Sequence, residues 1–257
     1  MSNVVNQEYW DSSYSNLNLE YDEKKVLFKK IFEKYLRHNP QGSCIEIGCY
    51  PGNFLIYICS KFKYIANGVD TTPYINTKLV PHLKNNNISI GDFFQQDFMS
   101  FNPGITYDLV CSFGFIEHFR NMDDVMLKHI ELVKPDGTLI ISCPNYRKIQ
   151  YILHKLLDSD NLERHVLETM DLHKMTQILE KYDMEVLFQG YFKTADFWID
   201  SNHQSFLKPV LSQCITYVFS IINKYVDKPN SWLSPYMICI AKKKNSPNNS
   251  TNVKKIL

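Results

Sequence analysis

The chain has almost no net charge and no concentration of charge of one sign. Its 257 residues contain 28 Lys and Arg against 27 Asp and Glu, which gives a formal net charge of +1 at pH 7. A protein that binds nucleic acid normally gathers basic side chains on one surface to contact phosphates. The even scatter of charge along this sequence predicts no such surface, so we expect neither DNA nor RNA as a partner.

Paired cysteines and closely spaced histidines are also missing. The seven cysteines occur singly, without a Cys-x-x-Cys pair, and no His-x-x-x-His pair is present. Short metal-binding motifs use these spacings, so the sequence predicts no metal site. Four cysteines lie in apolar runs and are most simply reduced core residues: Cys44, Cys111, Cys143 and Cys239.

No apolar run is long enough to cross a bilayer, and residues 1–8 lack the basic and apolar regions of a secretion signal. Together with the reduced cysteines, this predicts a cytoplasmic protein. The longest uncharged helical pattern is Pro209–Asn223, which polar residues interrupt. We expect this helix to be buried as a cap over the binding site, as a homodimer contact through 207–226, or on a membrane surface, in that order of preference.

Short apolar runs alternate with helical patterns, as is typical of a parallel α/β domain. The expected strands lie at 44–47, 64–69, 88–94, 109–111, 138–142, 184–191 and 234–242, and the expected helices at 22–38, at 53–62, from 121, and through most of 146–184. We expect one domain over 1–242, with an N-terminal arm and helix in 1–40 and a helical insert at 192–233. Residues 243–257 are expected to be a disordered tail.

The most informative stretch is Ser43–Phe54, which combines a buried strand, a turn with Gly48 and Gly52, and the start of an apolar helix. The unpaired N–H groups at such a helix start let the polar end of a ligand approach the backbone. Glu46 ends the strand, where we expect its carboxylate to meet polar or cationic groups of that ligand. A nicotinamide site would need Gly-x-Gly-x-x-Gly here, which the chain lacks.

The order acid-x-Gly-x-x-x-Gly from Glu46 to Gly52 resembles motif I of the class I S-adenosylmethionine (SAM) dependent methyltransferases. The cofactor of that family carries a sulfonium and an ammonium group. Tyr50 departs from the commonest form of the motif, which has a third glycine at this place. The resemblance assigns cofactor contacts to Glu46, Gly48, Cys49, Tyr50, Pro51, Gly52 and Asn53.

Two further acids follow expected strands. Asp70 lies 24 positions after Glu46, where nucleoside-binding βαβ units place a carboxylate on the ribose hydroxyls. Thr71, next to it, is a further candidate cofactor contact. The alternative is that Asp70 merely begins a turn or caps the helix from Tyr74. The resemblance further implies that Asp97 accepts a hydrogen bond from the adenine amino group, while the backbone of Phe98 contacts the ring.

The stretch Tyr107–Phe119 resembles motif IV of the same family, including its Glu-His pair. The resemblance places Ser112 and Gly114 near the methionine part of the cofactor and His118 on the acceptor side. A histidine at that place is a candidate general base, since its ordinary pKa of about 6.5 lies near operating pH. The alternative is that His118 only braces the loop. His165 is either a substrate contact or a solvated surface histidine.

Weaker matches flank these motifs. Asn121 caps an expected helix, Lys134–Gly137 is an expected turn, and Thr138–Ser142 is a buried strand. The segment Tyr9-Trp10-Asp11 with Tyr14 resembles an arm that closes over cofactor and substrate in many small-molecule methyltransferases. Tyr14 is therefore a candidate cofactor contact, unless these aromatic side chains merely cover exposed core.

The resemblance implies an α/β fold, namely a Rossmann-like, seven-stranded, mostly parallel sheet with a terminal antiparallel hairpin, helices on both faces and a small helical cap. It implies transfer of a methyl group from SAM to an O or N atom of a small-molecule acceptor, with S-adenosylhomocysteine (SAH) as product and no metal. His118 would act as a base only for a hydroxyl acceptor. The Gly-Cys-Tyr-Pro-Gly turn and the Ser-Pro-Tyr strand resemble enzymes that modify bacterial surface glycans, capsules or their phosphorylated and phosphoramidate precursors.

Three alternatives stay open. A lipid or quinone O-methyltransferase at a membrane surface would use the helix from Pro209 to touch lipid. A SAM-fold binding protein without turnover fits the interruption of the glycine pattern at Tyr50. A nicotinamide-dependent enzyme would bind NAD instead.

Overall fold

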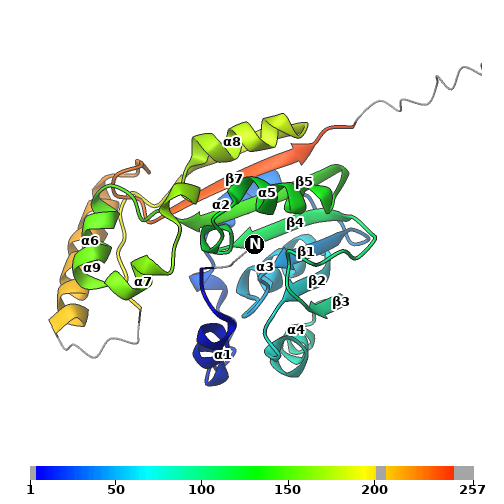
Figure 1. Ribbon diagram of the computed structural model, residues 1–257, viewed down its shortest axis with the longest axis horizontal. Helices are drawn as coiled ribbons and strands as arrows, with labels where there is room; N and C mark the ends of the chain where they lie inside the picture. Colours follow the sequence, from blue (N-terminus) through cyan, green and yellow to red (C-terminus); the bar gives the residue numbers. More distant parts are fainter. Residues whose placement is uncertain (1–3, 201–206, 246–257) are drawn as a thin grey trace, which may run out of the picture.

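The computed structural model describes residues 4–200 and 207–245, which form a sheet covered by helices (Figure 1). In this part of the chain the sheet has seven strands in the order β3-β2-β1-β4-β5-β7-β6. The strands are β1 Ser43–Ile47, β2 Ile65–Asp70, β3 Ile90–Gln95, β4 Tyr107–Phe113, β5 Val133–Pro144, β6 Met184–Phe192 and β7 Tyr236–Lys243. The predicted Rossmann-like fold is confirmed.

Strands β1 to β5 run parallel to one another in the sheet. Strand β7 lies between β5 and β6 and is antiparallel to both, which is the predicted terminal hairpin. Strand β1 is buried on both faces, because Cys44, Ile45 and Ile47 expose no surface. The carboxyl ends of β1 to β4 therefore meet at one edge of the sheet.

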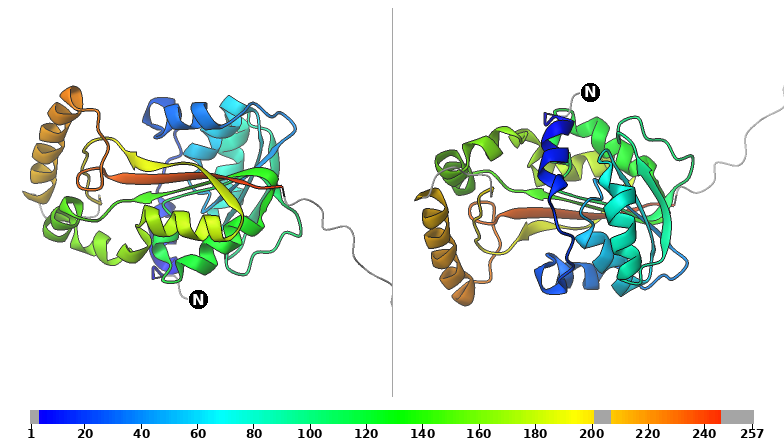
Figure 2. Two further views of the ribbon diagram at one scale, coloured as in Figure 1. Left: turned by 90° about the horizontal axis from the view of Figure 1, so that it is seen from above. Right: turned by 90° about the horizontal axis from the view of Figure 1, so that it is seen from below.

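Helices cover both faces of this sheet (Figure 2). Those on one face are α2 Lys29–Tyr35, α3 Asn53–Phe62 and α4 Val80–Asn85, and those on the other are α5 Met122–Glu131 and α8 Leu172–Lys181. The other helical segments described are α1 Gln7–Ser15, α6 Ile149–Leu157, α7 Ser159–Glu163, α9 Leu207–Tyr225, η1 Glu23–Lys25, η2 Ile75–Leu79, η3 Ile116–His118 and η4 Leu167–Thr169. The hydrophobic core fills the space between the sheet and its two helical layers.

Two local predictions are wrong. The expected helix over 22–38 is divided at Phe28, whose φ of 61 separates η1 from α2. The Phe28 ring lies 4.6 Å from the Phe192 ring, and this buried aromatic contact offsets a backbone conformation that costs a non-glycine residue about 1–2 kcal/mol. The expected turn Lys134–Gly137 lies inside β5, where the pairing with β4 changes register.

Helix α9 lies beyond the end of the sheet with α6 and α7 (Figure 1). It packs through Phe219 on Ala195, Phe197 and side chains of α6. The sequence predicts a buried helix, but only Ser212 and Phe219 are buried. The prediction fails because one stripe of the helix is enough to hold it against its neighbours. Several of its apolar side chains are exposed: Leu207, Val210, Leu211, Tyr217, Val218, Ile221 and Tyr225.

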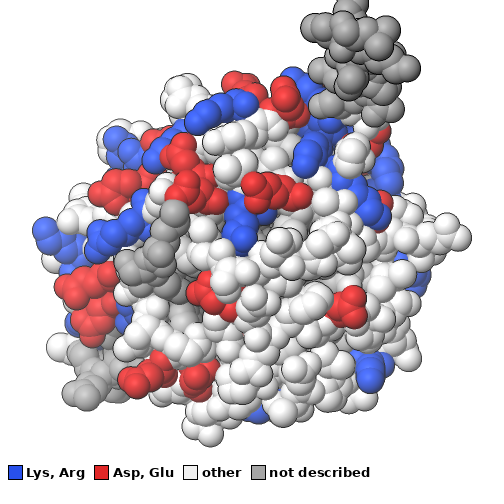
Figure 3. Space-filling model, turned by 45° about the vertical axis from the view of Figure 1, so that its right-hand side comes forward, with Lys and Arg blue, Asp and Glu red and all other residues white. Residues whose placement is uncertain are grey.

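Basic and acidic side chains are interspersed on the face seen in Figure 3. That the protein binds no nucleic acid stays a prediction. Within residues 4–200 and 207–245, no helix has the length and apolar character that crossing a bilayer requires. The expected tail at 243–257 falls largely outside the described residues, which end at 245, two positions after β7.

Candidate functional site

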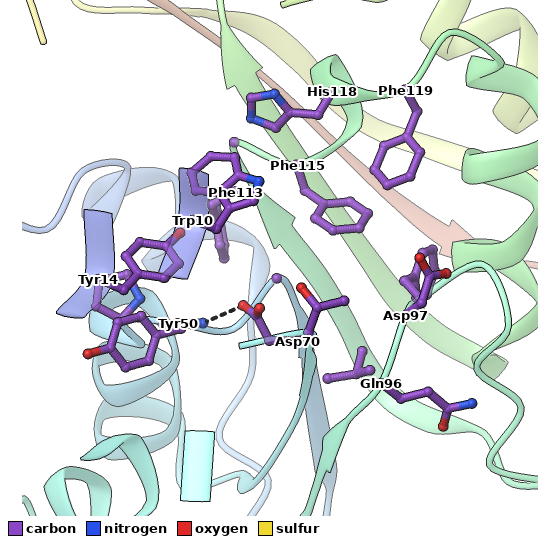
Figure 4. A pocket seen from close by; sticks show the side chains of 16 residues that line it. Trp10, Tyr14, Tyr50, Asp70, Gln96, Asp97, Phe113, Phe115, His118 and Phe119 are labelled. Atoms are coloured by element: carbon purple, nitrogen blue, oxygen red, sulfur yellow. Dashed lines mark hydrogen bonds between the residues drawn. The ribbon is translucent and has the colours of Figure 1, made fainter. Parts of the chain in front are cut away.

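A pocket lies at the carboxyl ends of β1 to β4, the edge at which open α/β sheets bind ligands (Figure 4). It brings together ten of the residues predicted for the site, which are Tyr14, Gly48, Tyr50, Pro51, Asp70, Thr71, Asp97, Phe98, Gly114 and His118. Its other lining residues are Trp10, Val69, Gln96, Phe113, Phe115 and Phe119. His118 lies at one end of the pocket and Gln96 at the other (Figure 4).

Asp70 is held in place at the end of β2. Its Oδ2 accepts a hydrogen bond from the Tyr50 N–H at 3.1 Å, and its Oδ1 accepts one from the Thr72 N–H, also at 3.1 Å. Burial raises the pKa of Asp70, and these backbone donors oppose that rise. A carboxylate has about four lone-pair sites, so Asp70 keeps acceptor capacity for a ligand.

Asp97 follows β3 on the same pocket wall. Its Oδ1 accepts a hydrogen bond from the Met99 N–H at 2.7 Å, which fixes the carboxylate at the start of a turn. Its side chain is otherwise exposed, and Phe98 beside it is buried. Asp70 and Asp97 thus line one pocket although they follow different strands.

The turn after β1 brings backbone to the pocket wall. Gly48 has φ 68, and a Cβ at this position would come within 2.7 Å of the Phe115 ring. Gly52 has φ 86, and a Cβ there would come within 2.4 Å of Leu79. Both glycines are therefore required by backbone conformation and by space. Tyr50, at the place of the third glycine, turns its ring toward Tyr14, with 4.8 Å between the ring centroids.

Cys49, Gly52 and Asn53 were also predicted to contact the cofactor, but they lie outside the pocket lining. Cys49 is fully buried, and its sulfur lies beneath the turn, where a Cβ on Gly68 would come within 2.6 Å of it. Gly52 caps α3 rather than facing the pocket. The turn therefore reaches the pocket only through Gly48, Tyr50 and Pro51.

Glu46 does not line the pocket either, contrary to the sequence prediction. Successive side chains of a strand point to opposite faces, and Glu46 shares the face of Cys44, which packs in the core beside α3. The side chain is 4% exposed, and its Oε2 has no hydrogen-bond partner. Burial raises the pKa of Glu46 well above its ordinary value.

Ser112 is a further predicted contact that lies outside the lining. It shares a face of β4 with Val110, toward α5, and its Oγ lies 3.1 Å from Nε2 of the buried His129. The Nδ1 of His129 donates to the Val125 carbonyl at 2.7 Å, so Nε2 accepts the Ser112 hydroxyl proton. Ser112 is therefore used inside the core, whereas Gly114 lines the pocket.

His118 is held by the backbone of a distant segment. Its Nδ1 lies 2.9 Å from the Arg164 carbonyl oxygen, which can only accept, so Nδ1 carries the proton and Nε2 a lone pair. Burial lowers the pKa of His118 to about 4, and the Arg164 contact partly opposes this effect. The ring is therefore neutral at pH 7 and keeps one basic nitrogen.

Helix α1 closes one side of the pocket, as the arm resemblance predicts. The rings of Trp10 and Tyr14 stack at 5.6 Å between centroids, and Trp10 meets the His118 ring edge-on at 5.1 Å. The arm is attached by a hydrogen bond from the Val4 N–H to the His118 carbonyl and by one from Lys78 Nζ to the Ser15 carbonyl.

No described residue of α9 lines this pocket, so α9 is not the predicted cap.

The sequence analysis missed four aromatic lining residues, namely Trp10, Phe113, Phe115 and Phe119. Aromatic residues in apolar runs are usually core, so only the Tyr-Trp-Asp segment offered a signal. It also missed that Glu117, His118 and His165 come together, with one ligand-capable atom of each within 4.8 Å of the others. His165 is separated from the pair by more than forty positions, which no short motif reveals.

Comparison with known proteins finds similarity to methyltransferases. A family model described as a methyltransferase domain matches residues 20–189. A ubiquinone biosynthesis O-methyltransferase of Rickettsia akari (strain Hartford) is 25% identical over 168 residues, covering 65% of this chain and 64% of that protein. This chain thus spans less than two thirds of the length of that relative.

Solved structures share the fold at low identity. A SAM-dependent methyltransferase from Archaeoglobus fulgidus has a TM-score of 0.54 at 18% identity, covering 84% of this chain and 93% of that one. The [4+2]-cyclase SpnF has a TM-score of 0.56 at 13% identity, covering 92% of each chain. At these identities the likeness concerns the fold alone, but the family model matches more than half of the sequence. The chain therefore belongs to the class I SAM-dependent methyltransferases.

Proposed function

We propose that this protein binds SAM and transfers its methyl group to an oxygen or nitrogen of a small-molecule acceptor, releasing SAH. The observation that carries the proposal is the single pocket that Gly48, Asp70, Asp97 and Gly114 line at the carboxyl edge of the sheet. A scattered arrangement of these residues would not fit an adenosine that bears a positively charged sulfur. Membership of the methyltransferase family supports the same conclusion.

The lining residues fit the parts of such a cofactor. Asp70 has lone pairs left to accept the two ribose hydroxyl protons, and Asp97 is exposed in the pocket beside Phe98, where it would accept from the adenine amino group. Gly48 and Gly114 present backbone without side chains for the methionine part. When bound, SAM supplies a methyl group on a positively charged sulfur. The residues of this chain hold it and exclude water.

The acceptor side is formed by His118 and the surrounding aromatic rings. Trp10, Phe115 and Phe119 exclude water and help to align an acceptor with the methyl carbon, and alignment of this kind supplies much of the rate in a displacement. If the acceptor is a hydroxyl, the lone pair of His118 Nε2 takes its proton, as the sequence analysis proposes. An amine acceptor needs no such base.

For the acceptor, we favour a sugar or a phosphorylated or phosphoramidate precursor of a bacterial surface polysaccharide. This choice is supported by the resemblance of the Gly-Cys-Tyr-Pro-Gly turn and the Ser-Pro-Tyr strand to enzymes of that kind. Among the described residues that line the pocket there is no Lys or Arg, so a phosphate group would have to lie outside it.

The second candidate is methylation of a lipid or quinone at a membrane surface. It is supported by one exposed stripe of α9, in which residues recur at spacings of three and four: Leu207, Leu211, Cys214, Val218, Ile221 and Tyr225. Ile152 and Leu156 of α6 are also exposed. A relative named as a ubiquinone biosynthesis O-methyltransferase gives independent support.

One labelling experiment tests the proposed function and separates the two acceptor classes. The protein is incubated with methyl-labelled SAM and a cell extract, which is then partitioned between water and organic solvent. Label in a water-soluble product supports the glycan precursor, and label in the organic phase supports the lipid or quinone. Calorimetric binding of SAM and SAH without label in either phase would contradict methyl transfer and favour a binding protein, since one fold can host unrelated functions.

The exposed stripe gives a separate prediction. Replacing Leu211 and Val218 by Asp should lower binding to vesicles that contain anionic lipid by about 100-fold or more, because two apolar side chains that each contribute about 1.5–3 kcal/mol when buried are lost together. Vesicle flotation measures the effect. Ile105→Asp is the control, since Ile105 is 53% exposed in the loop before β4. If the wild-type protein does not float but light scattering shows a dimer that the double variant loses, the stripe is a dimer contact instead.

A further inference from the structure

We propose that Glu117, His118 and His165 form a binding site for a divalent transition-metal ion, such as Zn²⁺, at the acceptor end of the pocket. Two segments build this site. Glu117 and His118 belong to η3, and His165 precedes η4. One nitrogen or oxygen atom from each of the three side chains lies within 4.8 Å of the others.

The two segments are joined at this point by one backbone hydrogen bond and by one hydrogen bond from a side chain to a backbone carbonyl. The Val166 N–H donates to the Glu117 carbonyl at 2.7 Å, and His118 Nδ1 donates to the Arg164 carbonyl at 2.9 Å. The rings of His118 and His165 lie 4.8 Å apart. Their closeness therefore follows from two hydrogen bonds between the segments, one of which is made by the His118 ring itself.

Both histidines keep one ring nitrogen with a lone pair. His165 Nδ1 lies 2.6 Å from the Asn161 carbonyl, and His118 Nδ1 is held by the Arg164 carbonyl in the same way. A carbonyl oxygen can only accept, so each Nδ1 carries a proton and each Nε2 a lone pair. Metal-binding histidines in proteins typically donate their other N–H to a carbonyl or carboxylate in this manner, which fixes ring and tautomer.

Burial raises the pKa of the Glu117 carboxyl to about 8, so Glu117 would give up a proton when a metal ion binds its carboxylate. Its side chain is 1% exposed, and Oε2 has no hydrogen-bond partner. A buried polar atom without a partner costs about 1–3 kcal/mol, so it normally has a structural or functional reason. A cation held by the two imidazoles would provide the missing partner.

The ligand set indicates the class of metal. Two imidazoles and one carboxylate suit Zn²⁺ and its neighbours in the first transition row, whereas Mg²⁺ and Ca²⁺ prefer oxygen alone. Ligand atoms around Zn²⁺ stand about 3.3 Å apart, because each lies about 2.0 Å from the metal, so the three side chains would draw together on binding. Three protein ligands leave a fourth position for substrate, as in catalytic zinc sites.

If the proposed function holds, the fourth coordination position is available to the acceptor. His118 also lines the pocket, so the open position would face the acceptor. A hydroxyl bound there loses its proton to water more readily, because the metal lowers its pKa. The oxygen then forms the bond to the methyl carbon, and the electron pair of the broken C–S bond stays on sulfur, which gives SAH. His118 would act as a ligand rather than as the base.

Calorimetric titration with Zn²⁺ and visible spectroscopy with Co²⁺ test the site. The full-length chain is freed of metal with a chelator, and Cys214→Ser is the background because Cys214 is the one exposed cysteine among the seven, all of which are described. We expect one ion per chain and the absorption bands of a four-coordinate Co²⁺. His165→Ala and Glu117→Gln should weaken binding on the order of 100-fold, and His173→Ala, which replaces an exposed α8 histidine, should not change it.

Circular dichroism verifies that each variant is folded, and titration with SAM tests the proposed function separately. Equal Zn²⁺ affinity in the background protein and in folded His165→Ala and Glu117→Gln would overturn the site, as would the absence of stoichiometric binding. If the metal binds with these variant effects but SAM does not, the metal site stands and the proposed function fails. If SAM binds and methyl transfer is unaffected by chelator, the catalytic role of the metal fails and His118 keeps its role as a base.

Discussion

Replacing Asp70 by Ala should weaken SAM binding on the order of 100-fold. Asp70 is the carboxylate proposed to hold the ribose hydroxyls, and hydrogen bonds to a charged group contribute about 1.5–3 kcal/mol each. A hundredfold change in the dissociation constant corresponds to about 2.7 kcal/mol, which is less than two such bonds because water replaces part of the loss. Isothermal titration calorimetry with SAM and with SAH measures the effect.

Replacing Asp70 by Ala also removes hydrogen bonds that hold the turn after β1. Asp70 accepts the N–H groups of Tyr50 and Thr72, so its removal frees the backbone beside the cofactor. Asp70→Asn keeps one acceptor oxygen and should weaken binding only about 10-fold. Asp92→Ala, an exposed β3 residue outside the pocket, is the control and should bind as the wild type does. Wild-type affinity in folded Asp70→Ala would show that the cofactor is placed wrongly.

Replacing Phe32 by Ala should lower the free energy of unfolding by about 3–5 kcal/mol. Phe32 is fully buried, and its ring lies 5.8 Å from the Phe113 ring and 6.3 Å from the Phe54 ring. Phe54 in turn stacks on Phe113 at 4.0 Å, and Phe113 lines the pocket. The cavity left by the ring would therefore lie directly behind the pocket wall.

Urea unfolding measures this loss as a lower midpoint at an unchanged slope. Ile105→Ala serves as the matched truncation, because the Ile105 side chain is 53% exposed and its loss should change stability by less than about 0.5 kcal/mol. A Phe32→Ala midpoint equal to that of Ile105→Ala would contradict the assignment of Phe32 to the core. SAM affinity should fall much less than in Asp70→Ala, since no proposed cofactor contact is removed.

The sequence predicted the position of residues that follow strands better than the direction of residues inside them. Asp70 and Asp97 come directly after β2 and β3, and the meeting of parallel strands at one edge is enough to bring them together. Glu46 and Ser112 lie within β1 and β4, where the alternation of faces decides the outcome and turns both away from the pocket. A resemblance to motifs indicates where a residue lies in the chain, but it does not indicate to which face of the strand the side chain points.

Contacts between segments that are distant in the chain could not be predicted from the sequence. Phe28 has a left-handed conformation and packs against the rings of Phe54 in α3 and Phe192 in β6. The helical periodicity of residues 22–38 does not reveal these contacts. The pairing of His118 with His165 depends on how the segment after α7 folds back on η3. For α9, an uncharged sequence predicted burial, but the described chain covers only one side of it.

The attachment of α1 bears on how fast the protein can work. None of the nine residues of this helix is buried, and polar contacts at Val4 and Lys78 help to hold it against one side of the pocket. Swinging it aside leaves the sheet intact, so ligands can exchange without global unfolding. Release of the product SAH would then require α1 to move away from the pocket. The rate of this movement would set an upper limit on the turnover rate.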